Sequence, residues 1–308
     1  MGVGVLKKVT YTKWKMRRSL VLLTFVLPGV IWYLTFHYAP MFGVTIAFQD
    51  YNPFQGFGRN WIGLRHFRTF FNSLFFWPLL RNTLFLSLSN LAWTFPMPII
   101  FALLQYEVKF KRFRTSVQSI SYFPHFISVV IICGLIRTFT AQSSGIINEL
   151  IATLGGDRIN FMMDPRWFRT LYVSSSVWQS IGWGSIIYYA TLTSIDTTLF
   201  EAADIDGASR PQKIWHISLP SLRPTITILL LLNLGNMMNI GFEKVLLLYS
   251  PPVYEVADII STYVFRTGIV TQQFSFAAAV GLFNSVIGII LITTFNAISR
   301  RFNETSLW

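Results

Sequence analysis

The chain is poor in charge and in cysteine, and each shortage restricts what it can be. Charged residues make up 12% of its 308 residues, whereas a soluble domain usually carries about 25%. The charges cluster between long apolar runs, which excludes a large soluble domain and indicates a protein that crosses the membrane several times. The single cysteine, Cys133, cannot form an internal disulfide, so it is no sign of an oxidising compartment.

The sequence also lacks the patterns that carry catalysis or bind metals. There is no Gly-x-x-x-x-Gly-Lys-Ser/Thr loop, so we expect this chain not to hydrolyse ATP. No His-x-x-x-His pair or cysteine pair is available for a metal ion, and no catalytic triad of residue types stands out. We therefore expect no enzyme, cofactor, metal site or nucleic-acid partner. The histidines are scattered, and packing or interfacial roles suffice for them: His37, His66, His125 and His216.

Long apolar runs predict an all-α membrane fold. A membrane span requires about 20 mostly apolar residues. By that rule six spans lie at roughly 19–42, 77–106, 116–140, 168–195, 222–247 and 274–299. The first apolar run is too long for a signal-peptide core and no small-residue cleavage site follows it, so we expect no cleavable signal. Without an internal repeat or a linker, residues 1–308 are expected to form one transmembrane domain.

The distribution of lysine and arginine predicts the orientation of these spans. Cytoplasmic loops carry an excess of both residues. Here they gather in the amino-terminal tail, after the second span, in the polar stretch between the fourth and fifth spans, and in the carboxyl-terminal tail. The opposite side has arginines but almost no lysine. The bias places both termini in the cytoplasm, as an even number of spans also requires.

The polar stretch between the fourth and fifth spans is the most informative part of the sequence. We predict a short helix over 199–205, a turn at Gly207 and a second short helix over 211–217 that ends before Pro220. Such a compact unit at a membrane face is typical of a docking element, although an ordinary amphipathic loop would also fit each piece alone. The pattern consists of Glu201-Ala202-Ala203, two residues, Asp206-Gly207-Ala208, eight residues, then Ile217, any residue, Leu219 and Pro220.

This pattern resembles the EAA loop of membrane subunits of bacterial ABC importers that work with a separate solute-binding protein. Other stretches are similar to permeases for complex saccharides, the polysaccharide or lipoprotein-type group. Among them are Leu27-Pro28-Gly29, 46–54, Gly182-Trp183-Gly184-Ser185, 241–249 and 258–266. The resemblance covers nearly the whole chain. It implies a type I importer transmembrane domain in a bacterial cell membrane, with a coupling loop at about 196–222.

The resemblance also implies partners and a mechanism. A second permease, which we expect to be a different chain, would complete the pathway. Two cytoplasmic ATPase subunits would bind ATP and magnesium, and an extracellular or periplasmic solute-binding protein would deliver an oligo- or polysaccharide. ATP binding would move the EAA loops and turn the pathway outward, within membrane lipid. Glu201 is placed for charge-assisted hydrogen bonds with the ATPase, and Ala202 and Ala203 leave room for close approach.

Polar and aromatic side chains within the spans are candidates for the substrate pathway. On the fifth span, residues three and four apart share one helical face, and amides and carboxylates can bond sugar hydroxyls. On the fourth span, aromatic rings can stack on sugars. Helix packing would explain the asparagines and an interfacial position the tryptophans equally well. The candidates are Asn233, Asn236, Asn239 and Glu243 on the fifth span and Trp178, Trp183 and Tyr188 on the fourth.

Arg81 and Arg137 are charged residues inside predicted spans, where a guanidinium needs a wet cavity or a partner. One explanation is an acidic sugar such as a uronate oligomer. The other is a structural ion pair with Glu243 or with a carboxylate of the second subunit.

Two other functional classes compete with an importer permease. A secondary carrier or channel for a small polar solute would show internal repeats, which are not found, and would leave the EAA loop without a role. A membrane enzyme would require a catalytic constellation that the sequence lacks.

Overall fold

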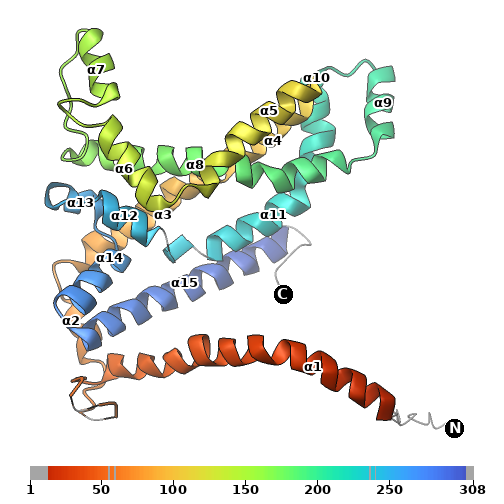
Figure 1. Ribbon diagram of the computed structural model, residues 1–308. Coiled ribbons are helices and arrows are strands. Elements are labelled where there is room, and N and C mark those ends of the chain that lie inside the picture. Colours follow the sequence, from red (N-terminus) through yellow and green to blue (C-terminus); the bar gives the residue numbers. More distant parts are fainter. Residues whose placement is uncertain (1–12, 55, 59, 236, 240, 303–308) are drawn as a thin grey trace.

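The protein is helical throughout the part that the structure describes. This computed structural model describes residues 13–302 except residues 55, 59, 236 and 240. Within those residues the only extended pairing is an isolated antiparallel bridge between Gln49 and Trp61. Long helices run across the molecule in Figure 1. The start of α1 (Lys13–Tyr33) and the end of α15 (Phe274–Phe302) lie toward the same side as α9 (Thr197–Ile205) and α10 (Arg210–Lys213).

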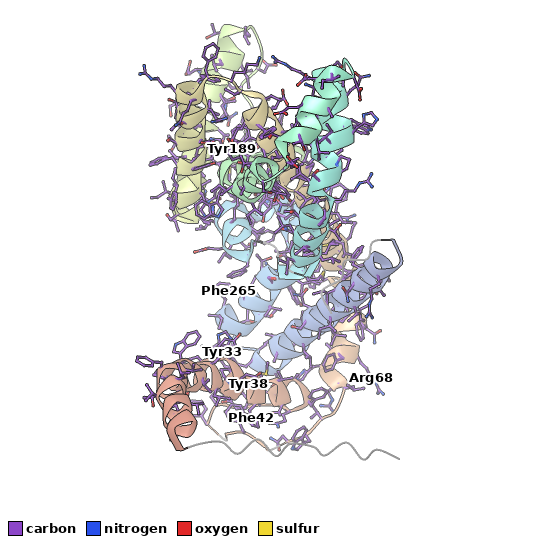
Figure 2. The ribbon with its side chains drawn as sticks, turned by 90° about the vertical axis from the view of Figure 1, so that its right-hand side faces the viewer. Tyr33, Tyr38, Phe42, Arg68, Tyr189 and Phe265 are labelled. Atoms are coloured by element: carbon purple, nitrogen blue, oxygen red, sulfur yellow. The ribbon has the colours of Figure 1, made fainter. Side chains whose placement is uncertain are left out.

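The first long rod of the chain stands apart from the rest. It consists of α1 (Lys13–Tyr33), η1 (Leu34–Tyr38) and η2 (Ala39–Phe48), so the predicted span at 19–42 is helical. Within this rod, η2 packs on α15 (Phe274–Phe302) and α2 (Arg65–Phe71). The two views show the rod below the bundle, with Tyr33, Tyr38 and Phe42 labelled on it in Figure 2.

The centre of the bundle is α8, a helix from Pro165 to Thr193. It packs along α4 (Pro96–Glu107) and also contacts α3 (Phe76–Thr94) and α11 (Leu219–Gly235). The predicted spans at 77–106, 168–195 and 274–299 are therefore helical, with Pro96 beginning α4 directly after α3. Tyr188 and Leu192 of α8 are buried against α4 and α11 in one of the apolar cores.

The third predicted span, 116–140, is wrong as a single helix. The chain forms α5 (Lys111–Tyr122), η3 (Phe123–Phe126) and α6 (Val129–Phe139), and the two arms meet at 101°. Pro124 lies in the corner, and the Ser128 side chain caps α6 by accepting a hydrogen bond from the Ile131 amide. A proline and a new N-cap both favour ending one helix and beginning another.

The fifth predicted span, 222–247, is also interrupted. α11 ends at Gly235, and two short elements follow, η5 (Met237–Asn239) and α12 (Phe242–Leu248). Glycine disfavours the helix interior, and Gly241 lies where an added Cβ would be 2.4 Å from the Tyr172 hydroxyl oxygen. The break therefore lets the backbone approach α8 closely, before the chain continues into α12.

The remaining elements are short and lie at the end away from α9 and α10 (Figure 1). Among them, Asp258 and Arg266 form an ion pair with 2.6 Å between Oδ2 and Nη2. The Asn148 amide holds its loop by donating to the carbonyl oxygens of Thr140, Ala141 and Ile159. The elements are α7 (Ile146–Thr153), η6 (Pro251–Val253), α13 (Tyr254–Ala257), α14 (Ile260–Phe265) and η7 (Arg266–Val270).

Four described helical stretches are long and apolar enough to cross a membrane, and the bent pair of α5 and α6 makes a fifth if the pair is counted as one span. The four are Leu20–Phe48, Phe76–Glu107, Arg210–Gly235 and Phe274–Ala297. The long helix α8 is not among them, because serines, arginines and a glutamine reduce its apolar character. A helix surrounded by other helices needs no continuous apolar surface, since protein rather than lipid covers it.

Candidate functional site

The first candidate site is an exposed helix pair that follows α8. α9 (Thr197–Ile205) confirms the helix predicted over 199–205. The Asp196 carboxylate caps it by accepting a hydrogen bond from the Thr198 amide at 2.9 Å, and this bond lowers the pKa of Asp196. Gly207 has a φ of 72°, which confirms the predicted turn. The Ala208 amide then donates to the Ala203 carbonyl oxygen at 2.8 Å and closes the end of the helix.

The sequence analysis predicted that the second helix of the pair ends before Pro220, and this prediction is wrong. α10 (Arg210–Lys213) and η4 (Ile214–Ser218) run into α11 without a break, so residues 210–235 form one helical rod. In η4 the Leu219 amide donates to the Ile214 carbonyl oxygen, five residues back. This wider turn accommodates the ring of Pro220, which cannot donate a backbone hydrogen bond.

The helix pair presents charge and backbone to its surroundings. Lys213 and Asp204 form an ion pair that joins the second helix to the first. The side chains of Glu201, Ala202 and Asp206 are exposed, as is Gly207. The other residues of the pattern are partly buried: Ala203, Ala208, Ile217, Leu219 and Pro220. The exposed half is therefore a rigid surface that the chain itself leaves uncovered.

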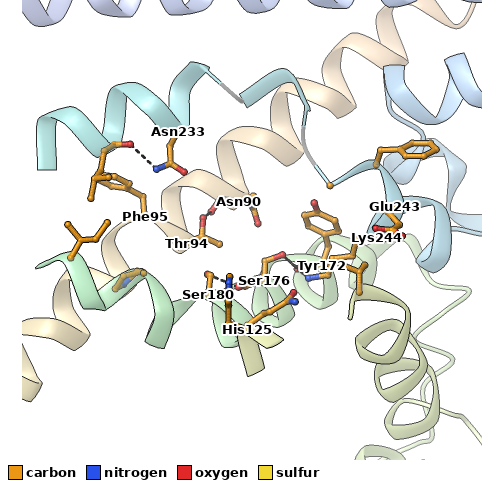
Figure 3. Close-up of a pocket in the computed structure, with 18 of the residues that line it drawn as sticks. Asn90, Thr94, Phe95, His125, Tyr172, Ser176, Ser180, Asn233, Glu243 and Lys244 are labelled. Carbon is orange, nitrogen blue, oxygen red and sulfur yellow. Dashed lines mark hydrogen bonds between the residues drawn. The ribbon is translucent and has the colours of Figure 1, made fainter. Parts of the chain in front are cut away.

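The second candidate site is a cavity of about 700 Å³ between α3, α4, α8, α11 and α12 (Figure 3). Polar groups from four of these helices line it: amides and hydroxyls of α3 and α8, the amide of Asn233 on α11, and the two charged residues at the start of α12. His125 of η3 also reaches the cavity, and its ring stacks on Trp183 with 4.5 Å between ring centroids. Mixed apolar walls and several polar groups are typical of a site for a small organic molecule.

Three of the predicted pathway residues line this cavity: Asn233, Glu243 and Tyr188. The prediction that Asn233 and Glu243 share one helical face is wrong, because α11 ends at Gly235 and Glu243 lies on α12. Asn236 and the side chain of Asn239 lie outside the described residues. Trp178 and Trp183 are 47% and 45% exposed and are not part of the cavity lining.

The two arginines predicted inside spans bind backbone rather than carboxylates. Arg81 donates to the Glu255 carbonyl oxygen at 3.3 Å, and Arg137 donates to the Leu247 carbonyl oxygen. Among the described residues neither forms an ion pair with Glu243, so that part of the explanation is wrong, and a pair with a carboxylate of the second subunit stays a prediction. Neither arginine lines the cavity.

Sequence reasoning missed the most deeply buried charge of the cavity, Lys244. Its side chain is 5% exposed, and its Nζ donates to the Ser176 hydroxyl at 2.8 Å and to the Tyr172 carbonyl oxygen at 3.2 Å. One signal was available: Ser176, Gln179 and Ser180 occur at helical spacing on α8, and all three line the cavity.

The remaining polar lining residues that the sequence analysis did not single out are Asn90 and Thr94 of α3. Within the part of the chain that the structure describes, no group of three or more His, Cys, Asp or Glu side chains is arranged to hold a metal ion.

One element connects the two candidate sites. The rod over 210–235 begins in the exposed helix pair, and Leu229 and Asn233 near its other end line the cavity. The exposed helix pair and part of the cavity wall therefore belong to one continuous helical stretch.

Known proteins share this architecture and this sequence. The family model described as binding-protein-dependent transport system inner membrane component matches residues 75–304. The polygalacturonan/rhamnogalacturonan transport system permease protein YteP of Bacillus subtilis is 43% identical over 97% of this chain and 96% of its own length. Protein LplB of the same organism is 42% identical over 95% of this chain and 92% of its own length.

A solved structure agrees with this assignment. One chain in the crystal structure of a bacterial alginate ABC transporter, in complex with an alginate pentasaccharide-bound periplasmic protein, superimposes with a TM-score of 0.88. That chain is 42% identical, and the match covers 95% of this chain and 98% of that one. The chain described above therefore belongs to the family of binding-protein-dependent transport system inner membrane components.

Proposed function

We propose that this chain is one of two permease subunits of an ATP-driven importer and forms half of a pathway for an oligosaccharide. A solute-binding protein outside the cell would deliver the sugar, and two cytoplasmic ATPase subunits would bind ATP and magnesium. The similarity to a polygalacturonan/rhamnogalacturonan permease and to the importer of the acidic polysaccharide alginate supports an acidic saccharide as the substrate.

The proposed topology has six crossings in a bacterial cell membrane. They are the first rod, α3 with α4, α5 with α6, α8, α10 with α11, and α15. α8 has 29 residues, enough to span about 30 Å of hydrocarbon at 1.5 Å per residue. The distribution of lysine and arginine supports a cytoplasmic position for both termini and for the helix pair α9 and α10.

The exposed first rod supports pairing with a second permease. Every side chain from Leu20 to Phe42 is exposed in this chain, and Phe25 and Phe42 are 80% and 78% exposed. Lipid can cover part of such a surface. A second permease subunit would cover the rest, by close packing of the kind that joins helices in membranes.

The observation that carries the coupling mechanism is the unbroken rod over 210–235. An ATPase subunit that holds the exposed half of the helix pair would move the rod when it binds ATP. Because Leu229 and Asn233 belong to the rod, the cavity wall moves with it. The exposed Glu201 carboxylate would accept hydrogen bonds from the ATPase, and the turn at Gly207 would keep the two short helices in a fixed relation.

Substitution of Glu201 by alanine and of Gly207 by valine tests this coupling. We expect both variants to insert and assemble normally but to lose sugar-stimulated ATPase activity and uptake in liposomes that contain the complete importer. At Gly207 the cause is backbone strain of about 1 kcal/mol, because an added Cβ meets no atom within 4 Å.

One control variant matches the Glu201 variant by removing another exposed carboxylate, and a second matches the Gly207 variant by adding a Cβ at another glycine. Asp157→Ala removes an exposed carboxylate, and Gly134→Ala adds a Cβ that also meets no atom within 4 Å. Both should leave coupling intact. Normal coupling in the Glu201 and Gly207 variants would refute the docking role of the helix pair.

A further inference from the structure

The cavity holds a buried ammonium group that has only neutral partners among the described residues. An ammonium has three N–H donors. Lys244 Nζ donates to the Ser176 hydroxyl and the Tyr172 carbonyl oxygen, and its nitrogen lies 5.0 Å from the Tyr172 ring centroid. No described carboxylate lies within 4.0 Å of it. A charge at this depth is costly, and such residues in membrane proteins commonly mark a substrate or ion pathway.

We propose that the Lys244 ammonium binds the carboxylate of an acidic sugar in this cavity. This inference rests on the proposed function and goes further, because it assigns the charge selectivity to one side chain. The ammonium lies at the cavity wall beside Ser176 (Figure 3), so a uronate carboxylate can take the third N–H without breaking the two existing bonds. Charge-assisted hydrogen bonds are about twice as strong as neutral ones.

The other ionisable groups of the cavity fit this arrangement. Glu243 precedes Lys244 on α12, but its side chain is exposed, so water screens its charge more than that of the buried ammonium. A carboxylate accepts hydrogen bonds only, which suits the hydroxyl groups of a sugar. His125 lines the cavity from η3 and is already stacked on Trp183. Lys244 is therefore the described group best placed to hold a negative charge.

A purely structural role is the competing explanation for Lys244. Its two hydrogen bonds both end on α8, so the side chain also joins α12 to α8. Ser176→Ala separates the two roles, because it removes one of these bonds and leaves the positive charge in place. Lys244→Met removes the charge and keeps a long apolar side chain.

The experiment measures equilibrium binding of two trisaccharides to the purified complete importer without its solute-binding protein. The probes are trigalacturonate and the same trimer with its carboxyl groups reduced to alcohols. For Lys244→Met we expect trigalacturonate to bind about 10- to 100-fold more weakly and the reduced trimer to bind within about twofold of the wild type. Ser176→Ala should change the binding of both trimers by less than about fivefold. Thermal unfolding of each variant reports on the structural role.

Three results would overturn the assignment. If Lys244→Met weakens the binding of both trimers equally, Lys244 has a structural role that joins α12 to α8. The same conclusion follows if Ser176→Ala weakens binding as much as Lys244→Met does. A wild-type importer that binds both trimers equally would remove its role in selectivity while leaving the proposed saccharide pathway intact. A wild-type importer that binds neither trimer would refute that pathway itself.

Discussion

α1 and α8 are both long helices, yet α1 is exposed from Leu20 to its end, where it is apolar enough for a membrane span, and α8, which is not, lies at the centre of the bundle. α1 belongs to a stretch that meets the requirements of a membrane span, whereas α8 does not. Tyr188 and Leu192 of α8 are nevertheless 3% and 0% exposed. The difference shows that hydropathy along a membrane protein reports which helices face lipid, and says less about which helices other helices surround.

The contrast has a physical cause. Lipid is as apolar as a leucine side chain, so an apolar helix gains little by leaving it for the protein interior. Serine and glutamine side chains, in contrast, need partners inside the membrane. On α8, Ser185 donates to the Gly182 carbonyl oxygen at 2.6 Å, and Gln179 donates to the Ile127 carbonyl oxygen at 3.1 Å. These two polar side chains of α8 thus find their partners within protein.

The largest expected loss of stability that would test the difference between α1 and α8 is at a glycine of α8. A Cβ added at Gly182 would lie 2.1 Å from the Ser121 carbonyl oxygen, so Gly182→Ala must force α5 away from α8. We expect a loss of about 3 kcal/mol in stability, at the upper end for overpacking, measured as thermal unfolding in detergent. The matched control, Gly29→Ala on α1, meets no atom within 4 Å and should leave stability unchanged or slightly higher. Equal effects at both glycines would contradict the central position of α8.

A smaller effect is expected from shortening a leucine on each helix. Leu192→Ala should cost about 2 kcal/mol, because it opens a cavity between α8, α4 and α11. Leu27→Ala on α1 should cost much less, since that side chain is 52% exposed in this chain. Chemical denaturation of the purified chain compares the two. A Leu27 variant as unstable as the Leu192 variant would show that α1 is packed against the bundle.

The smallest expected effect concerns what covers α1 in the assembled importer. With Cys133 replaced by alanine, a cysteine at Leu27 should react with a membrane-permeant maleimide several-fold more slowly in the complete complex than in the chain alone. A cysteine at the buried Ser185 should react slowly in both states. An unchanged rate at position 27 would mean that lipid, rather than the second permease, covers this part of the rod.

The outcome of the sequence predictions follows the same division between local and distant interactions. The helix over 199–205 and the turn at Gly207 were predictable, because the Asp196 cap and the positive φ depend on neighbouring residues. The continuous rod through Pro220 was not, because proline normally ends a helix and the wider turn of η4 is a rare alternative.

The cavity was predicted only in part for a similar reason. Asn233, Glu243 and Tyr188 were chosen as polar or aromatic residues of spans, and they do line it. Asn233 and Glu243 would share one helical face only on a single straight helix, and α11 ends between them. Lys244 was missed because its burial depends on Tyr172 and Ser176, about 70 residues away in the sequence.

The sequence by itself determined the class of protein, the helical runs and the exposed helix pair, since composition, apolar length and local turn chemistry are properties of neighbouring residues. Only the tertiary structure decided the 101° bend between α5 and α6, the break after Gly235 and the burial of Lys244. Pro124, the Ser128 cap and glycine permit the bend and the break locally, whereas the close approach of Gly241 to Tyr172 and the burial of Lys244 depend on contacts between helices that are distant along the chain. Close packing and hydrogen bonding inside the membrane select among several local conformations that the sequence alone permits.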